Sequence, residues 1–320
     1  FGIWNIGGKF MYFPYLRGRQ FELIALRELI ENDCINSSII PIIEPVKPTA
    51  TLLKTIEAFV SRDREIAVVM NPEVGDFVDK LSGLRTENSK LANSLLDLLE
   101  NCNKVIKAYI MNKESAVFLA GNNDKENKLI INRDRDSLND FLDVYDGVLP
   151  RFTLIPDDRA FKRMVPDSKV LLEDCFNKKV RNVDYLDNED EFFTDNNIYF
   201  EEDDLVGFSD YSVVGEEFNE SGFAPVAVAI HIIYFDENKA LRIHHFVSDS
   251  NTGIEDPAGK FGEALEKLVE WCNRHNVQST LGMKGFYDCY NSGKYPGLGT
   301  VKKYSIMHHL ELVSDYLGGK

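Results

Sequence analysis

Cysteine is scarce in this sequence. The chain has five cysteines in 320 residues, at Cys34, Cys102, Cys175, Cys272 and Cys289, and no two of them form a Cys-x-x-Cys pair. A disulfide framework or a structural zinc site needs cysteines in an even or closely spaced set. We therefore exclude both as the basis of the fold and expect reduced thiols in a cytoplasmic protein.

Long apolar runs are also missing. The longest, such as those at 38–43 and 225–235, fall well short of the roughly 18 residues that a membrane-spanning helix needs. We therefore expect no membrane partner.

Basic residues are outnumbered, with 36 Lys and Arg against 52 Asp and Glu and a formal net charge of −16. Ten of the acids lie between Asp184 and Asp204, a stretch without Lys or Arg. Nucleic-acid backbones bind clustered Lys and Arg, so direct binding of duplex DNA is not expected, although a local basic pocket stays compatible with the sequence. We interpret the acidic stretch as a solvated loop; the alternative is a contact surface for a basic partner, or a mimic of nucleic acid.

Recognised catalytic motifs are absent from the sequence. It contains no nucleophile elbow, no protein-kinase motif and no His-Glu-x-x-His. Whether the protein is an enzyme is left open, and no cofactor is indicated.

A regular alternation of strands and helices is present from Met11 onward. The predicted strands are 12–17, 39–44, 66–71, 105–111, 128–132, 148–154, 169–173 and 205–214, with helices at 20–32, 50–61, 87–101, 113–120, 137–145 and from 159 onward. Such alternation implies right-handed crossovers and a parallel sheet. Eight units predict a (β/α)8 TIM-like barrel within a single domain, residues 11–320; an open doubly wound parallel sheet is the alternative. Residues 1–10 differ in character, and we interpret them as a tag or extension.

The chain changes character after the eighth strand. Two apolar runs at 225–235 and 240–248 predict a β-hairpin inserted into the barrel domain. Pairing about Glu237 and Asn238 places His231 opposite His244. No carboxylate or cysteine at ligand spacing completes a metal site there, so no metal is predicted. Two helices at 257–275 and 300–317 follow, separated by a loop-rich segment at 282–299.

Polar residues fall at the predicted carboxyl ends of the strands, where parallel barrels form their sites. These candidates are Arg17, Glu44, Asn71, Asn132, Arg133, Asp134, Glu173, Asp174, Asp210 and Tyr211. Arg17 and Glu44 belong to neighbouring strands, and two interpretations stay open. Either Arg17 holds an anionic group while Glu44 acts as a base or metal ligand, or the two form a salt bridge that ties the rim of the barrel together.

A second candidate site precedes the last helix, at Gly297, Gly299, Thr300 and Lys302. Two glycines let the backbone approach a ligand, Thr300 can cap the helix, and free N–H groups there attract phosphate. Ordinary loop geometry is the alternative. His309 shares a stripe with apolar residues of the last helix; it either orients a substrate or is a buried structural histidine.

Four segments together resemble a known family. YLRGRQFELIALREL and IIPIIEP near the start, with FSDYSVVG and GTVKKYSIMHHLELV further on, resemble the beta-protein family named from a tailed phage, and more closely its uncharacterised bacterial relatives. The resemblance runs from Met11 to about Leu317. It implies a barrel-like fold, association with mobile elements and antiviral defence, and a nuclease-like neighbouring gene product as partner.

The resemblance assigns no reaction. Arg17, Glu44, Asp210 and His309 match motif positions, but the family supplies no established activity for them. This sequence also has Lys303 and Tyr304 where a Trp is expected before the two histidines. The equivalence of the last loop is therefore left open.

Two hypotheses about function follow. In the first, Arg17, Glu44, Asp210 and His309 converge at the barrel mouth around a small anionic or phosphorylated ligand, in a pocket of roughly 300 Å³ or more. In the second, the protein is a non-enzymatic scaffold or regulatory subunit, the barrel mouth is filled, and the acidic stretch and hairpin contact a partner protein.

Overall fold

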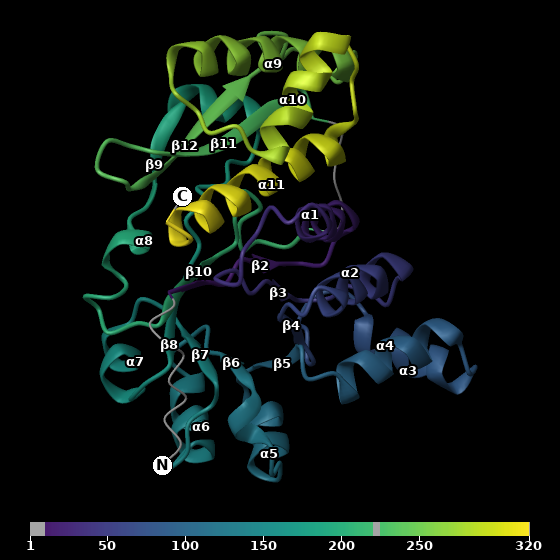
Figure 1. Cartoon of the computed structure of the whole chain (residues 1–320), viewed down its shortest axis with the longest axis vertical. Helices are drawn as coiled ribbons and strands as arrows, with labels where there is room; N and C mark the ends of the chain where they lie inside the picture. The colour runs from purple at the N-terminus through teal and green to yellow at the C-terminus, as the bar shows by residue number, and fades with distance from the viewer. Residues whose placement is uncertain (1–9, 220–224, 320) are drawn as a thin grey trace.

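The structure, a computed structural model, describes residues 10–219 and 225–319. Its main element is a nine-stranded sheet in which every neighbouring pair is parallel. The strand order is β1 (Met11–Tyr12), β10 (Gly207–Asp210), β8 (Lys169–Glu173), β7 (Phe152–Ile155), β6 (Leu129–Ile131), β5 (Val105–Ile110), β4 (Ile66–Val69), β3 (Ile42–Ile43) and β2 (Tyr15–Leu16). The predicted parallel α/β, barrel-like architecture is therefore confirmed (Figure 1).

The two end strands of this sheet, β1 and β2, follow each other in the chain, with only Phe13 and Pro14 between them. β1 pairs with β10, whereas β2 pairs with β3. Backbone hydrogen bonds continue across the interruption, because Phe13 N–H donates to the carbonyl of Phe208 and Ile42 N–H donates to the carbonyl of Pro14. Pro14 has no N–H to donate, which accounts for the break between the two strands. The sheet is consequently curled, with both its ends at one segment.

The two faces of the sheet are covered differently. On one face, the side chains of the strands pack against one another in an apolar cluster that contains no helix residue, which we call the strand-only cluster. On the other face, the sheet packs against the surrounding helices in the largest apolar cluster, which we call the helix-side cluster. A doubly wound sheet has helices on both faces, so the observed arrangement differs from that alternative.

Helices connect the strands as the alternation predicts. They are α1 (Gln20–Glu31), α2 (Ala50–Ser61), α3 (Phe77–Thr86), α4 (Lys90–Asn101), α5 (Lys113–Ala120), α6 (Ser137–Val144), α7 (Arg159–Met164) and α8 (Asn196–Tyr199), with short 3₁₀ turns η1 (Lys125–Asn127) and η2 (Asn182–Asp187). Thr49 caps α2, because its Oγ1 accepts from Leu52 N–H at 3.1 Å. α3 was not predicted; it buries only Phe77 and Leu81, too few apolar residues to give a clear helical period.

A second sheet lies beyond the first and has three antiparallel strands. β11 (Ala229–Phe235) and β12 (Leu241–Val247) form the predicted hairpin, and β9 (Asp190–Thr194) adds to β12. The interpretation of the acidic stretch as a solvated loop is therefore wrong in part, because β9 lies inside it. The hairpin register is also shifted from the prediction, since His231 pairs with His245 rather than His244.

Three helices complete the chain: α9 (Pro257–Arg274), α10 (Leu281–Ser292) and α11 (Leu298–Leu317). α10 lies where a loop-rich segment was predicted. Figure 1 shows the second sheet with α9 and α10 at one end of the molecule, and α11 between this module and α1. The interpretation of residues 1–10 lies outside the described residues, apart from Phe10. None of the helices in the described ranges has the length and apolarity to cross a bilayer.

Candidate functional site

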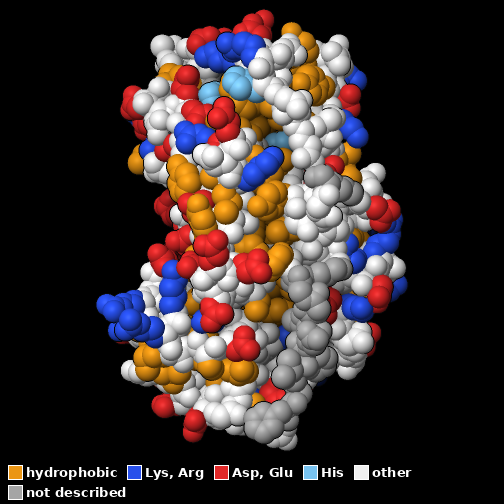
Figure 2. All heavy atoms as spheres, turned by 60° about the vertical axis from the view of Figure 1, so that its left-hand side comes forward, with side chains coloured by type: hydrophobic (Ala, Val, Ile, Leu, Met, Phe, Trp, Pro, Cys, Tyr) orange, Lys and Arg blue, Asp and Glu red, His pale blue; other side chains and the backbone are white. Residues whose placement is uncertain are grey.

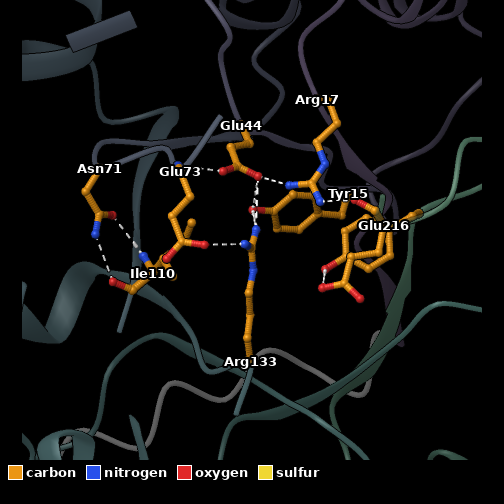
Figure 3. A network of polar contacts seen from close by, with 9 residues as sticks. Tyr15, Arg17, Glu44, Asn71, Glu73, Ile110, Arg133 and Glu216 are labelled. Atoms are coloured by element: carbon orange, nitrogen blue, oxygen red, sulfur yellow. Dashed lines mark hydrogen bonds and ion pairs between the residues drawn. The ribbon is translucent and has the colours of Figure 1, made fainter. Parts of the chain in front are cut away.

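Glu44 is the centre of a polar network at the carboxyl ends of the strands (Figure 3). Its carboxylate is fully buried and accepts hydrogen bonds from Tyr15 Oη at 2.8 Å, from the Arg17 guanidinium, and from Arg133 Nη2 at 3.0 Å. The second carboxylate oxygen accepts from the backbone N–H of Glu73 at 2.8 Å. The predicted pairing of Arg17 with Glu44 is therefore confirmed.

The alternation of strand side chains explains why these residues meet. Tyr15 and Ile42 belong to the strand-only cluster, so Arg17 and Glu44, each two positions further on, point to the same face. Arg133 follows β6 and brings a second cation, which also donates to Glu73 Oε2 at 2.6 Å. Burial by itself raises the pKa of Glu44, but the guanidiniums of Arg133 and Arg17 outweigh it and hold that pKa below its ordinary value.

Aromatic rings fill the remaining space beside Arg17. The rings of Tyr15 and Tyr211 lie 5.0 Å apart, and the guanidinium of Arg17 lies 5.3 and 5.2 Å from their centres. Arg17 also donates to the backbone carbonyl of Glu216 in the loop after β10. The pocket described below is not lined by Arg17, Glu44 or Arg133. The network thus occupies the space in which the first hypothesis expected a ligand.

Asp210 and His309 form a different cluster on the helix-covered face. Asp210 Oδ1 accepts from Tyr12 Oη at 2.8 Å and from Ser212 N–H at 2.7 Å, and Ser212 Oγ lies 2.9 Å from His309 Nδ1. Burial raises the pKa of Asp210 to about 7 and lowers that of His309 to about 3. Tyr12 belongs to the helix-side cluster, whereas Tyr15 belongs to the strand-only cluster. The four motif residues therefore do not converge around one ligand.

The other predicted site residues have structural contacts. Asn71 bridges to β5, accepting from Ile110 N–H at 2.9 Å and donating to the Ile110 carbonyl at 2.8 Å. Glu173 accepts from Asn196 Nδ2 at 2.5 Å. These contacts join neighbouring elements and leave the polar atoms engaged within the protein.

The predicted phosphate loop differs from its expectation in detail. α11 begins at Leu298 with Gly297 as its cap residue, at a φ of 86° that favours glycine, so Thr300 lies inside the helix. A Cβ on Gly299 would collide with the ring of Phe21, so this glycine is required for packing. Lys302, in contrast, lines a pocket beside the first turns of α11.

This basic pocket has a volume of about 550 Å³. Five cationic residues line it: Arg19, Lys178, Lys179, Arg181 and Lys302. None of its described lining residues is acidic. Arg19 follows β2, the segment at 176–185 follows β8, and Val213 and Val214 follow β10. The pocket therefore lies at the carboxyl ends of β2, β8 and β10.

Three of the five cations form no ion pair with a described carboxylate: Arg19, Lys179 and Lys302. The other two are paired, Arg181 with Asp184 at 2.6 Å and Lys178 with Glu217 at 3.1 Å. Burial of the Lys302 ammonium group lowers its pKa. Repulsion from Arg19 and Lys178 lowers this pKa further, whereas attraction to Glu22 raises it. A lysine in this setting gains from a bound anion.

Sequence reasoning identified Lys302 but not the other four cations. A signal for three of them was available in the sequence, because Lys178, Lys179 and Arg181 lie close together after the predicted strand 169–173. Figure 2 shows that acidic side chains are spread over one face of the molecule, which contrasts with the acid-free lining of the pocket.

Comparison with protein-family models, curated proteins and solved structures finds no match to this chain. The geometry itself therefore carries the functional argument.

Proposed function

We propose that this protein binds a small phosphorylated or otherwise anionic ligand in the basic pocket. The observation that carries the proposal is the lining of five cations without a described acid, in a chain of net charge −16. The volume of about 550 Å³ lies within the range of roughly 300–1,000 Å³ that small-molecule sites have.

Barrel topology gives independent support to the proposal. We infer that β1 and β2 act as one strand, which makes β8 and β10 the seventh and eighth strands of a (β/α)8 barrel. The pairing of β1 with β10 and of β2 with β3 supports this inference. Barrel enzymes commonly bind phosphate at the loops after strands seven and eight, beside a helix N-terminus, and the basic pocket has the same relation to β8, β10 and α11.

Pyrophosphate binding measured by titration calorimetry tests the proposal. Wild-type protein is expected to bind, and Lys302→Gln and Lys179→Gln each to weaken binding at least tenfold. Lys294→Gln, an exposed lysine outside the pocket, is the matched control and should bind as wild type does. Affinity should also fall with added salt, because added ions screen the attraction between the cations of the pocket and the anionic ligand. No binding, or equal binding by all four proteins, would contradict the proposal.

A second candidate function is a scaffold or regulatory subunit for a partner protein such as a nuclease. The filled barrel mouth favours it, because Arg17, Glu44 and Arg133 satisfy one another there. The exposed acids at 201–204 offer a surface for a basic partner. The link to phage defence and mobile elements stays a prediction from the resemblance. Co-purification of a partner that is lost when these four acids become Asn or Gln would support this function.

A further inference from the structure

Two histidines and a carboxylate form a hydrogen-bonded chain that leads into the basic pocket. His231, which lines the pocket, has its Nδ1 2.7 Å from Nδ1 of His245. Nε2 of His245 lies 3.2 Å from Glu191 Oε1. No hydrogen bond joins Nε2 of His231 to another described residue, and this atom is the end of the chain on the pocket side. The order is therefore Glu191, His245, His231, pocket.

The hydrogen bonds between Glu191 and His245 and between His245 and His231 fix which ring nitrogen carries each proton. Glu191 can only accept when ionised, so His245 must donate its Nε2 proton to it. The other nitrogen of a neutral His245 is then an acceptor, and His231 must donate its Nδ1 proton to it. It follows that Nε2 of His231 has a free lone pair on the side of the pocket. This is the tautomer that a general base requires.

Packing holds both rings in these positions. His231 and His245 are directly opposed in the register of β11 and β12, so their side chains lie on the same face of that sheet. The ring of Tyr185 lies 4.7 Å from that of His231 and 4.5 Å from that of His245, and Phe176 lies 5.1 Å from His231. Glu191 is supplied by β9, the strand inside the acidic stretch.

The surroundings keep His231 unprotonated at neutral pH. Burial lowers its pKa well below the ordinary value, and the charges of His245 and Lys302 lower it further. Burial also lowers the pKa of His245, although Glu191 opposes this effect while His244 and Lys179 add to it. Lys302 lines the same pocket as His231, so the pocket holds a cation as well as the base. A neutral base and an ammonium group thus face one pocket.

We propose that His231 is the general base of a phosphate-ester hydrolase whose substrate binds in the basic pocket, an inference that rests on the proposed function. Nε2 of His231 takes a proton from a water molecule, whose oxygen forms a bond to phosphorus. The bond between phosphorus and the ester oxygen breaks, and its electron pair stays on that oxygen, which takes a proton from the Lys302 ammonium. The imidazolium then returns a proton to Lys302 through water. His245 and Glu191 are positioning residues that fix the tautomer.

Hydrolysis of bis(p-nitrophenyl) phosphate and p-nitrophenyl phosphate tests the step. Wild-type protein is expected to release p-nitrophenol from at least one of them, and His231→Gln to reduce the rate about 100-fold or more, as loss of a general base does. His275→Gln is the control and should retain the rate, because His275 is exposed and takes no part in the hydrogen bonds of Glu191, His245 and His231. Glu191→Gln should lower the rate and alter the pH profile while pyrophosphate binding persists. Equal rates in wild type and His231→Gln, including no hydrolysis by either, would overturn the inference.

Nitrogen-15 NMR of the histidine rings gives a readout that does not depend on turnover. At pH 7, Nε2 of His231 should be unprotonated and should shift on addition of pyrophosphate, and Lys302→Gln should abolish that shift. A protonated Nε2, or no shift while calorimetry records pyrophosphate binding, refutes His231 as the base and leaves the proposed function standing. Loss of pyrophosphate binding altogether would instead remove the proposed function.

Discussion

The carboxylate of Glu44 accepts hydrogen bonds from the guanidinium groups of Arg17 and Arg133. Removing this carboxylate would leave both guanidinium groups without their buried counter-charge. The carboxylate is fully buried, and the side chain of Arg17 is only 5% exposed. Taking charges out of water is costly unless good hydrogen bonds compensate, and here Tyr15 and the Glu73 backbone complete the set. The network therefore stabilises the fold only while all its members are present.

Glu44→Gln should lower the free energy of unfolding by about 3–5 kcal/mol, as breaking a buried ion pair from one side does. Glu73→Gln, which removes the half-exposed partner of Arg133, should cost less than about 1 kcal/mol. Urea unfolding at pH 7 measures both. The contribution of Glu44 is present above its unfolded pKa and disappears as pH falls through its lowered folded pKa. Equal costs for the two variants would show that the network is not cooperative.

The sequence predicted the Arg17–Glu44 pair because both residues end adjacent strands. It could not predict that Asp210 faces the helices while Tyr211 faces the strand-only interior. Successive side chains point to opposite faces, so an error of one residue in a strand boundary moves a candidate from one face to the other. Arg133 was also a candidate, at the end of the predicted strand 128–132, but its neighbours in the sequence did not mark it as a partner of Glu44.

Asp210 gives the stability of the protein a distinct pH dependence. Its pKa rises from 3.8 to about 7 on folding because of burial, so the folded state binds the extra proton between these values. Its contribution to the free energy of unfolding therefore falls as pH rises through this window. Asp210→Asn should gain stability relative to wild type by up to about 1.4 kcal/mol per pH unit from pH 4 to 7. Thermal unfolding across this range measures it, with exposed Asp79→Asn as control; a flat difference would refute the assignment.

Glycines explain why α10 was predicted as a loop. Gly282 and Gly285 weaken the helical signal of the segment, since glycine disfavours helices. A Cβ on Gly282 would lie 2.7 Å from His308 N and still closer to the Tyr304 carbonyl, and one on Gly285 would meet the Tyr304 ring. Both glycines are therefore required by the close packing of α10 on α11. This requirement depends on tertiary contacts that local sequence does not contain.

Gly282→Ala should destabilise the protein by about 1–3 kcal/mol, because the added methyl group must displace the backbone of α11. Gly262→Ala is the matched control in α9, where no atom lies within 4 Å of the new Cβ. That change should stabilise by up to about 1 kcal/mol through helix propensity. Chemical unfolding of both variants measures the contrast. If Gly282→Ala also stabilises, then α10 and α11 are not packed closely.

At the scale of the whole molecule, α11 belongs to both parts of the structure. Lys303 pairs with Glu28 of α1 at 2.8 Å, and His309 contacts Ser212 after β10. On its other side, His308 Nε2 lies 2.8 Å from the carbonyl of Ile233 in β11, and its Nδ1 lies 2.8 Å from Thr280 Oγ1 at the start of α10. The adjacent histidines thus join the barrel-like sheet to the C-terminal module.

This shared helix predicts that the sheet and the module unfold together. Leu310 is fully buried in the cluster that α11 shares with α1 and the strands, so Leu310→Ala should cost about 2–5 kcal/mol. Trp271 fluorescence, measured with Trp4→Phe in every protein because the sequence has two tryptophans, follows the module, while far-UV circular dichroism follows the whole chain. Their unfolding midpoints should coincide in wild type and should shift by the same amount in Leu310→Ala, as they do in a two-state transition. Leu298→Ala, at a partly exposed position of the same helix, should shift them much less. Separate midpoints for the two signals would mean that the module is an independent domain.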